Sequence, residues 1–390
     1  MRLRLISKMN PKRIRNRVFL VRVDLNIEAG GEKNAYRIHA ILPTILYLLH
    51  HKGKVVLLSH RGRPKRIGIT NKKLSLRPFA GILSGKLGVA VKFIPHFDFE
   101  KIESQIEAGK PGSIFLLENL RFLPGEEKND AKLGMRLAAL GDVFVNDAFA
   151  VSHRANASIV AITGFVPSYA GLLLEREVKS LDRAVNNYRH PMSIIIGGAK
   201  ISDKIGILQR FWKRADHFLL GGGPANTFLA AQGLPVGDSL IDKESIVFAR
   251  KYLKEKKILL PVDAKRQGGK ILDIGPETVA RFRTVIKDSK TILWNGPMGF
   301  FEKRGFEGGT KGVWKAVLQN KRATIVVGGG ELLASLATLM PADYKRITAE
   351  THRHKSAVIS TNPRLFLSTG GGAMLDYLSG KKLPGIEALK

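Results

Sequence analysis

Short apolar runs alternate along the chain with longer segments whose apolar residues recur at helical spacing. In the first half this pattern predicts strands at 18–23, 55–59, 114–117 and 143–145, and helices at 38–50, 76–87 and 131–140. In the second half it predicts strands at 192–196, 217–220, 258–262, 291–294, 323–327 and 365–367. Continuous apolar strands followed by helices are typical of parallel sheets covered on both faces. The expected fold class is therefore α/β, with the same scheme repeated in two domains.

An amphipathic helix is expected between the two halves. Residues 169–181 combine regularly spaced apolar positions with charged ones, a composition that favours a helix. We place the domain junction there. Length supports this division, because 390 residues are enough for two domains that each bury a core.

Composition limits the class of protein. The chain contains no cysteine, which excludes disulfides, thiolate metal sites and a cysteine nucleophile. No apolar run approaches the roughly 18 residues of a membrane helix, and residues 1–8 lack the apolar core of a signal peptide. We expect a cytoplasmic protein with no membrane partner.

The charge is strongly basic. Lys and Arg number 64 against 33 Asp and Glu, a formal net charge of +31 at pH 7. Such a field attracts anionic metabolites and nucleic acids, but it is also what a solvated basic surface would give. The excess is spread along the chain, and no basic heptad helix, zinc-ligand spacing or aromatic RNA-binding motif accompanies it. No specific nucleic-acid partner is therefore expected.

Polar residues follow the predicted strands of the first half. Asp24 and Asn26 could bind a substrate hydroxyl or could simply form a turn, and Arg37 taken alone could be a surface residue. The basic groups that follow later strands are His60, Arg63, Arg121 and Arg154. Because the carboxyl ends of parallel strands share one edge, these cations would lie close together, which is unfavourable without an anion. A guanidinium group is well shaped to bind such an anion. The set favours a site for a small, multiply charged acid.

Glycine clusters follow the predicted strands of the second half, at 197–198, 221–223, 328–330 and 370–372. Glycine lets the backbone approach phosphate closely, and helix N-termini attract anions. The clusters match neither the P-loop spacing nor Gly-x-Gly-x-x-Gly. They therefore predict phosphate binding without selecting a reaction, although an acid site and a phosphate site in one chain suggest phosphoryl transfer.

In their order, the motifs closely resemble those of the phosphoglycerate kinase family. They are VRVDLN at 21–26, SHRGRP at 59–64, LLENLRF at 116–122, NDAF at 146–149, GGAKISDK at 197–204, WNGPMG at 294–299, STGGGA at 368–373 and the ending GKKLPGIEAL at 380–389. The resemblance covers nearly the whole chain. It implies two doubly wound, Rossmann-like lobes joined by a hinge helix. We accordingly expect an N-terminal 3-phosphoglycerate-binding domain at 1–170 plus 374–390, a hinge helix at 171–186 and a C-terminal nucleotide-binding domain at 187–373.

The resemblance also implies the reaction and its ligands. Members of the family move a phosphoryl group reversibly between 1,3-bisphosphoglycerate and ADP, giving 3-phosphoglycerate and ATP, in glycolysis and gluconeogenesis. Mg²⁺ bound with ATP or ADP is the implied cofactor, and the protein is expected to be a monomer. With substrates on separate lobes, hinge closure would precede transfer.

Residue roles follow from the matched positions. Acid-binding positions match Asp24, Leu25, Asn26, Arg37, His60, Arg61, Gly62, Arg63, Arg121 and Arg154. Nucleotide-binding positions match Lys200, Lys204, Gly221, Gly222, Asn295, Pro297, Glu302, Gly328, Gly329, Gly330 and Glu331. Catalytic roles fall on Arg37, Lys200, Gly371 and Gly372, and Glu331 is the expected metal contact, mainly through nucleotide phosphates. No general base is needed, because the attacking carboxylate is already ionised near pH 7.

Two departures from the family pattern stand out. Glu331 follows the glycine triplet where the family usually has Asp, which bears on the metal-bound nucleotide. The basic stretch at 341–367 has no evident counterpart and could be a surface loop or a docking element.

Two other functions are weighed against this one. One is a basic nucleic-acid-binding protein on a kinase-like fold, although intact Arg37, Lys200 and Lys204 argue against a purely non-catalytic role. The other is a sugar or acetate kinase, which the acid-binding positions do not support.

Overall fold

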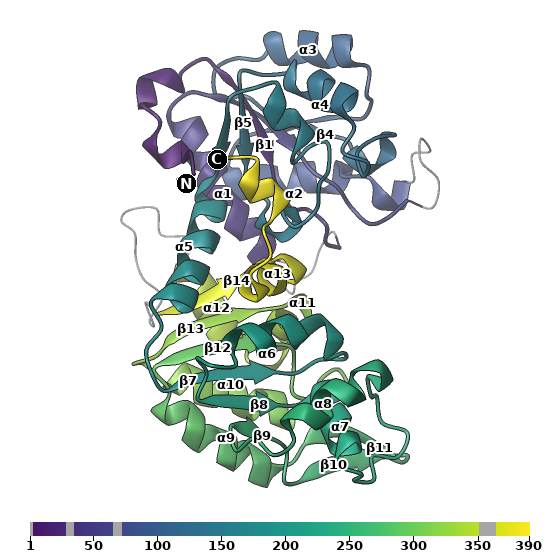
Figure 1. Cartoon of the computed structure of the whole chain (residues 1–390). Helices are drawn as coiled ribbons and strands as arrows, with labels where there is room; N and C mark the ends of the chain where they lie inside the picture. Colours follow the sequence, from purple (N-terminus) through teal and green to yellow (C-terminus); the bar gives the residue numbers. More distant parts are fainter. Residues whose placement is uncertain (1–2, 29–34, 65–71, 351–363) are drawn as a thin grey trace. The chain divides into compact units, whose positions relative to one another are not determined.

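The computed structural model describes residues 3–28, 35–64, 72–350 and 364–390, and the chain forms two compact units (Figure 1). Unit 1 comprises Met1–Val178 and Lys382–Lys390, and unit 2 comprises Lys179–Lys381. The first boundary falls inside the helix α5, Leu172–Asn186. No helix in the described part of the chain is both long and apolar enough to cross a membrane.

The sheet of unit 1 has six parallel strands in the order β3-β4-β2-β1-β5-β6. The strands are β1 Val18–Arg22, β2 Lys54–Leu58, β3 Val91–Ile94, β4 Ile114–Leu117, β5 Val143–Asn146 and β6 Ser168–Ala170. The helices are α1 Ala35–His50, α2 Arg77–Leu87, α3 Phe99–Glu107 and α4 Ala131–Ala138. Asp98 and Asp130 cap α3 and α4 by accepting hydrogen bonds from backbone N–H groups of the first turn.

Helices cover both faces of this sheet, because alternate strand residues enter two different cores. Phe19 and Leu57 pack in the core formed with α1 and α2. Leu20, Val56 and Phe144 pack in a second core with residues of α3 and α4. The sheet is therefore doubly wound.

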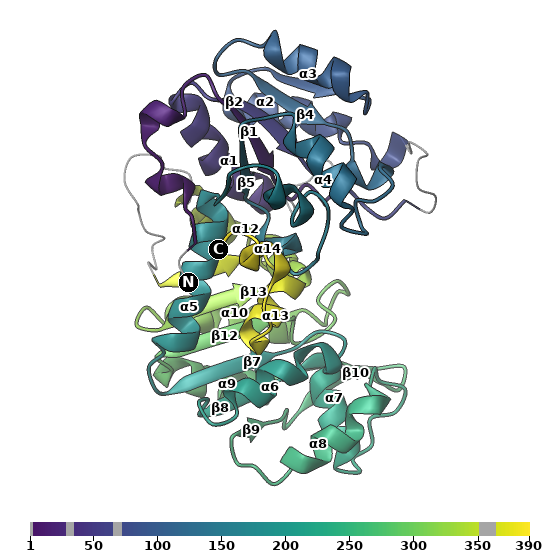
Figure 2. The same cartoon turned by 45° about the horizontal axis from the view of Figure 1, so that its top comes forward.

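The C-terminal helix α14, Pro384–Glu387, packs within unit 1 and can be followed in Figure 2. Gly385 N–H donates to the carbonyl of Ser152 at 2.9 Å, and Asn146 Nδ2 donates to the carbonyl of Gly385 at 3.1 Å. A Cβ at position 385 would lie 2.6 Å from Ile159 Cγ2. This close approach explains the glycine in the C-terminal motif.

Unit 2 repeats the architecture with a second parallel sheet, ordered β14-β13-β12-β7-β8-β9. Its strands are β7 Met192–Ile196, β8 His217–Leu220, β9 Ile258–Leu259, β12 Thr291–Asn295, β13 Thr324–Gly328 and β14 Leu365–Ser368. A separate antiparallel hairpin joins β10 Ala264–Gln267 to β11 Lys270–Ile274.

The helices of unit 2 form two groups. They are α6 Ile205–Phe211, α7 Gly222–Ala231, α8 Ile246–Tyr252, α9 Pro276–Asp288, α10 Gly308–Gln319, α11 Gly330–Leu339, α12 Pro341–Glu350 and α13 Gly372–Ser379. Helix α6 packs on α13 and α7 on α8, whereas α10 packs on both α9 and α11. Right-handed crossovers from this strand order place the two groups on opposite faces.

The predicted fold class is confirmed, with several local corrections. The junction helix begins at Leu172 rather than at 169, because Ser168–Ala170 pairs with β5 as strand β6. The strand predicted at 258–262 ends at Leu259, two residues before Pro261, which has no N–H to donate to a ladder. Strand β3, helix α3 and the β10–β11 hairpin were not predicted. Of the basic stretch at 341–367, residues 351–363 lie outside the described residues.

Candidate functional site

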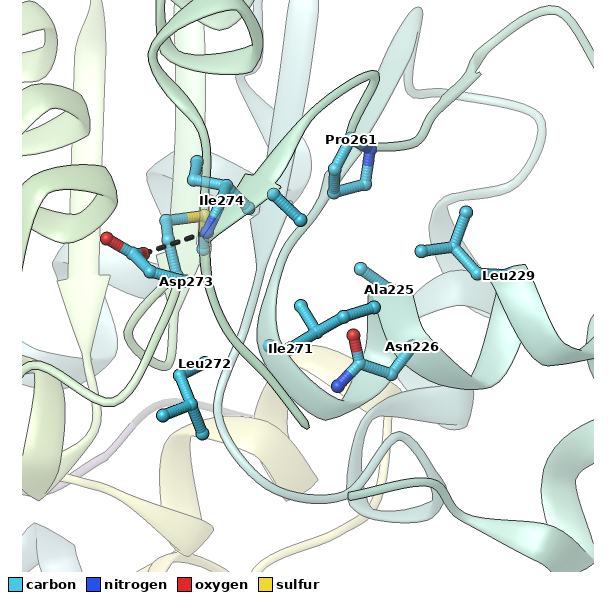
Figure 3. Close-up of a pocket in the computed structure, with 11 residues that line it drawn as sticks. Ala225, Asn226, Leu229, Pro261, Ile271, Leu272, Asp273 and Ile274 are labelled. Carbon is cyan, nitrogen blue, oxygen red and sulfur yellow. Dashed lines mark hydrogen bonds between the residues drawn. The ribbon is translucent and has the colours of Figure 1, made fainter. Parts of the chain in front are cut away.

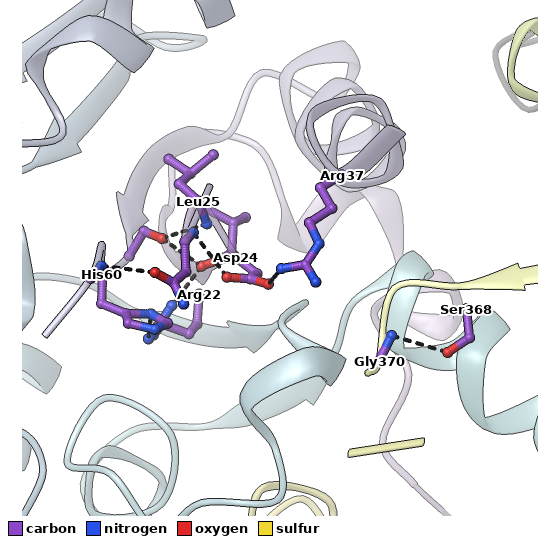
Figure 4. Close-up of polar contacts among 11 residues, drawn as sticks. Arg22, Asp24, Leu25, Arg37, His60, Ser368 and Gly370 are labelled. Atoms are coloured by element: carbon purple, nitrogen blue, oxygen red, sulfur yellow. Dashed lines mark hydrogen bonds and ion pairs between the residues drawn. The ribbon is translucent and has the colours of Figure 1, made fainter. Parts of the chain in front are cut away.

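In unit 1, Arg37 and Asp24 form an ion pair beyond the carboxyl end of β1 (Figure 4). Arg37 lies in the first turn of α1, and its NH1 is 2.9 Å from Asp24 Oδ2. The other carboxylate oxygen of Asp24 accepts from the Asn26 N–H at 3.0 Å. The arginine side chain is 24% exposed and the aspartate 8%, so a guanidinium is fixed in place with part of its surface open to a ligand.

The loops after β1 and β2 are tied to each other. Ser59 Oγ accepts from Leu25 N–H at 3.0 Å, and Gly62 N–H donates to Asn26 Oδ1 at 2.8 Å. Gly62 has a left-handed φ of +62°, and a Cβ there would lie 2.5 Å from Leu74. Glycine is therefore required for this loop to close around Asn26.

His60 lies at the centre of the cation cluster. It is 1% exposed, and Arg22 NH2 lies 3.0 Å from its Nδ1. Burial lowers the pKa of His60 well below its usual value of 6.5, and the nearby charges of Arg22, Arg121, Arg154 and Arg37 lower it further. His60 is therefore neutral at pH 7 among several permanent cations, an environment suited to a multiply charged anion.

Arg121, Arg154 and Arg63 complete this group. Arg121 is buried just after β4, donates to the carbonyl of Gly62 and lies 3.4 Å from Glu127 Oε1. The half-buried Arg154 places its Nε 3.2 Å from His153 Nε2. The charges of Arg154 and Arg63 both act on Arg121, so the three guanidinium groups share one neighbourhood.

Arg61 differs from its neighbours. Its guanidinium donates to the carbonyls of Ile27 at 3.1 Å and Ser75 at 3.2 Å, and it lies 5.6 Å from the centre of the Phe79 ring. These contacts hold two loops together. Its side chain is thus directed to the backbone, although the motif placed it in the acid site.

Sequence reasoning missed the buried polar residues beneath the site. Glu118 accepts from Leu76 N–H and Ser75 Oγ, and Asn119 Oδ1 accepts from the N–H groups of Arg61 and Arg121. Both residues are at most 4% exposed. Their position directly after the apolar strand β4 could have indicated this role. Buried polar side chains at that point must form hydrogen bonds, and the loop backbone supplies the partners.

In unit 2, the loops after β7, β8 and β12 interlock through glycine. Gly198 N–H donates to the carbonyl of Pro297 at 2.7 Å, and Gly223 N–H donates to the carbonyl of Gly198 at 2.8 Å. A Cβ at Gly197 would overlap the Pro297 carbonyl oxygen, and one at Gly223 would overlap that of Ala199. Glycine is therefore needed at positions 197 and 223 for these loops to pack.

Three helices begin at glycines beyond strand ends. Gly221 caps α7, Gly329 caps α11 with φ +113°, and Gly371 caps α13 with φ +44°. The triplets containing Gly328 to Gly330 and Gly370 to Gly372 thus lie at helix N-termini, whose backbone N–H groups attract anions. Ser368 Oγ accepts from Gly370 N–H at 3.0 Å and fixes the last of these turns (Figure 4).

Asn295 and the two lysines have different surroundings. Asn295 is buried and donates to the carbonyl of Gly328 at 2.8 Å, which ties the end of β12 to that of β13. Lys204 is buried, and its Nζ donates to the carbonyl of Lys200 at 3.0 Å. Burial lowers the pKa of Lys204, partly offset by the carboxylates of Asp203 and Glu331. Lys200 itself is exposed.

The exposed carboxylates of unit 2 bear on metal binding. Glu302 follows β12, and Glu331 lies in the first turn of α11. Among the described residues, no three His, Cys, Asp or Glu side chains gather as a metal site. Mg²⁺ is commonly held by one or two carboxylates together with substrate phosphates, and Glu331 beside a helix N-terminus fits that arrangement.

An apolar pocket adjoins the first turn of α7 (Figure 3). Its empty volume, which includes open solvent, is about 270 Å³, and its lining includes Leu229, Pro261, Ile271, Leu272 and Met298. Gly222 also lines it, so the pocket is continuous with the glycine loop after β8. The sequence gives no sign of this pocket, because nearly half of its lining residues lie in the unpredicted β10–β11 hairpin.

One unit is doubly wound and carries a cation cluster, and the other combines glycine-capped helices with an apolar pocket. Together these features define the class of two-domain α/β phosphotransferases. The family model described as phosphoglycerate kinase matches residues 9–381. The chain belongs to the phosphoglycerate kinase family.

Individual relatives agree over nearly the full length. The chain is 42% identical over 402 residues to the phosphoglycerate kinase of Pseudothermotoga lettingae, covering 96% of each chain, and 40% identical to that of Thermomicrobium roseum. Its structure is similar to phosphoglycerate kinase from Coxiella burnetii, with TM-score 0.80, 34% identity and coverage of 100% and 99% of the two chains. The Pyrococcus horikoshii enzyme gives TM-score 0.82 at 30% identity, covering 99% and 98%. The predicted family and enzyme class, a phosphotransferase with a carboxyl acceptor, are thereby confirmed.

Proposed function

We propose that this protein transfers a phosphoryl group reversibly between 1,3-bisphosphoglycerate and Mg-ADP, giving 3-phosphoglycerate and ATP, in glycolysis or gluconeogenesis. The observation that carries the proposal is the cation cluster around His60 in unit 1. A set of fixed guanidinium groups beside a neutral histidine suits a small acid bearing both carboxylate and phosphate. Family membership supports the same substrate.

In the acid site, Arg37 orients the carboxyl end and neutralises the group in transfer. Asp24 and Asn26 bind the substrate hydroxyl. The distal phosphate is held by His60, Arg63, Arg121 and Arg154. Leu25, Arg61 and Gly62 shape the loops that carry these groups, consistent with their backbone contacts.

In the nucleotide site, the base occupies the apolar pocket beside Gly222, and Gly221, Asn295, Pro297 and Glu302 surround the nucleoside. Lys200 and Lys204 neutralise the phosphates. The backbone N–H groups of Gly328, Gly329 and Gly330 bind phosphate oxygens, and those of Gly371 and Gly372 face the phosphoryl group in transfer.

The chemistry asks the protein chiefly to position and neutralise charge. Phosphoryl transfer spreads negative charge over three equatorial oxygens, with the attacking and leaving oxygens roughly in line. Arg37, Lys200 and the backbone N–H groups of α13 supply positive charge or hydrogen-bond donors for those oxygens. Mg²⁺, held through Glu331 and the nucleotide phosphates, would add charge neutralisation. The acceptor carboxylate is already ionised, so no residue must remove a proton.

The domain roles complete the proposal. Unit 1 binds the acid and unit 2 the nucleotide, with helix α5 as the hinge that allows the two substrates to meet away from water. The proposed setting is a monomer in the cytoplasm.

Calorimetric titration of each ligand alone tests this assignment. In the wild type both 3-phosphoglycerate and Mg-ADP should bind. Arg154→Ala should weaken 3-phosphoglycerate binding by about tenfold or more and leave Mg-ADP binding nearly unchanged, and Lys200→Ala should do the reverse. Equal loss of both ligands in either folded variant would contradict the assignment of the two sites to different units.

A further inference from the structure

The buried side chains behind His60 form a directed chain of hydrogen bonds. Glu126 accepts from Ser158 Oγ at 2.6 Å and from Ser158 N–H at 3.0 Å. Ser158 Oγ in turn accepts from Arg22 Nε at 3.0 Å. Arg22 NH2 lies 3.0 Å from His60 Nδ1 (Figure 4). All four residues are at most 1% exposed.

The direction of the last bond settles the histidine tautomer. A guanidinium has only donors, so Nδ1 of His60 must accept and cannot carry a proton. A neutral imidazole then carries its proton on Nε2. Within the described part of the chain, no group accepts a hydrogen bond from Nε2, although this atom is buried. A buried donor without an acceptor is unfavourable, and an anionic ligand would supply the acceptor.

The charge on Arg22 is balanced from behind. Burial lowers the pKa of the Arg22 guanidinium, and the negative charges of Glu126 and Asp24 oppose that shift. Ser158 links Arg22 to Glu126 through hydrogen bonds. Since the arginine is 1% exposed, it cannot itself cover a ligand. Arg22 NH1 donates a hydrogen bond to the carbonyl of Val23, which lies in the segment that also carries Asp24.

We propose that Arg22, held by Ser158 and Glu126, is a positioning residue that fixes His60 as the Nε2–H tautomer and aims this donor at the distal anionic group of the substrate. The inference rests on the proposed function for the identity of that substrate. It assigns a role to three residues outside the acid-binding set. The motif position of Arg22, between two apolar strand residues, had given no sign of it.

Nitrogen-15 NMR of the histidine ring tests the tautomer without requiring activity. In the wild type, His60 should show a protonated Nε2 and an unprotonated Nδ1. Arg22→Met should convert this pattern to a mixture of tautomers. Arg136→Met is the control, because Arg136 lies in α4 with its guanidinium over the ring of Phe99, and it should leave the His60 spectrum unchanged. A wild-type His60 protonated on Nδ1, or unaltered by Arg22→Met, would overturn the proposal.

Steady-state kinetics tests the consequence. Arg22→Met should raise KM for 3-phosphoglycerate by about tenfold or more, with smaller changes in kcat and in KM for ATP. Ser158→Ala, a milder change that keeps the arginine, should shift KM in the same direction by less. In a His60→Gln background, where a side-chain amide offers a donor without a tautomer, Arg22→Met should have little further effect.

The outcomes separate this proposal from the proposed function. Tautomer control by Arg22 in a protein that does not turn over 3-phosphoglycerate would support the positioning role and contradict the substrate. If Arg22→Met raises KM for 3-phosphoglycerate as much in the His60→Gln background as in the wild type, the positioning role is overturned and the kinase function is not. If Arg22→Met does not fold, Ser158→Ala carries the same tests, and an unchanged tautomer and KM there would contradict the chain.

Discussion

The guanidinium of Arg37 and the carboxylate of Asp24 lie 2.9 Å apart and join the start of α1 to the segment after β1. Because Asp24 also accepts from the backbone N–H of Asn26, one carboxylate contacts two residues assigned to the substrate. Loss of either partner should therefore affect binding of the acid more than the fold.

Arg37→Ala should lower kcat/KM for 3-phosphoglycerate by about a hundredfold or more, since it removes a fixed charge beside the transferring group. Arg37→Lys should retain part of the activity, because a point charge replaces a planar fork. Steady-state rates at saturating ATP measure both. Wild-type rates in Arg37→Ala would remove Arg37 from the reaction.

The carboxylate of Asp147 should make the free energy of unfolding depend on pH. It is fully buried and accepts from the N–H of Leu173 at 2.9 Å and of Leu174 at 3.3 Å, at the start of α5. Burial raises its pKa to about 7, against the opposing hydrogen bonds. Between about pH 4 and pH 7 the folded protein then keeps a proton that the unfolded chain has lost, so this group's contribution to stability falls as pH rises through that window.

Asp147→Asn removes this titration and keeps an oxygen acceptor for the helix. Relative to the variant, the wild type should lose about 3 kcal/mol of unfolding free energy between pH 5 and pH 8. Urea unfolding followed by circular dichroism measures the difference. Tryptophan fluorescence reports unit 2 separately, because all three tryptophans lie there. A wild-type-to-variant difference that is constant with pH would show that Asp147 does not titrate in this range.

Gly223→Ala should destabilise unit 2 by about 2 kcal/mol or more, because the new Cβ would overlap the carbonyl oxygen of Ala199. Tryptophan fluorescence during urea unfolding measures this change. Gly85→Ala is the matched control, since Gly85 lies within α2 and a Cβ there meets nothing within 4 Å. The control should stabilise unit 1 by up to about 1 kcal/mol. Equal effects from the two substitutions would contradict the packing explanation.

Glu331→Gln should raise the Mg²⁺ concentration needed for half-maximal activity by several-fold, because it removes the carboxylate proposed to contact the metal-bound nucleotide. Glu331→Asp keeps the charge and should stay closer to wild type. Activity measured over a Mg²⁺ titration at fixed ATP gives both values. Identical titrations for Glu331→Gln and wild type would exclude a role for Glu331 in metal binding.

The sequence predicts a secondary-structure element most accurately where its local apolar pattern agrees with its packing. The apolar run Ile114–Leu117 is a central strand with the predicted bounds, because both of its faces are buried. The hairpin of Ala264–Gln267 and Lys270–Ile274 was missed, because its first strand is polar and mostly exposed and is defined only by pairing across Gly268 and Gly269. Such tertiary pairing leaves no apolar period in the sequence.

The candidate site shows the same limit. Motifs pointed to His60 and Arg121, and the structure places both in one cation cluster. Motifs could not show that the Arg61 side chain turns to backbone carbonyls, or that Arg22 lies behind His60. Neighbouring arginines on one loop have the same chemistry in sequence, and only the fold distinguishes the one that faces a ligand from the one that holds the loop.

Phosphoryl transfer between 3-phosphoglycerate and ATP is the function proposed for this protein. The most direct measurement is a coupled assay that follows formation of 1,3-bisphosphoglycerate from Mg-ATP and 3-phosphoglycerate, comparing wild type with Lys200→Ala. The wild type should turn over robustly, and a folded Lys200→Ala variant should lose this turnover. No turnover by a folded wild-type protein would contradict the proposed function.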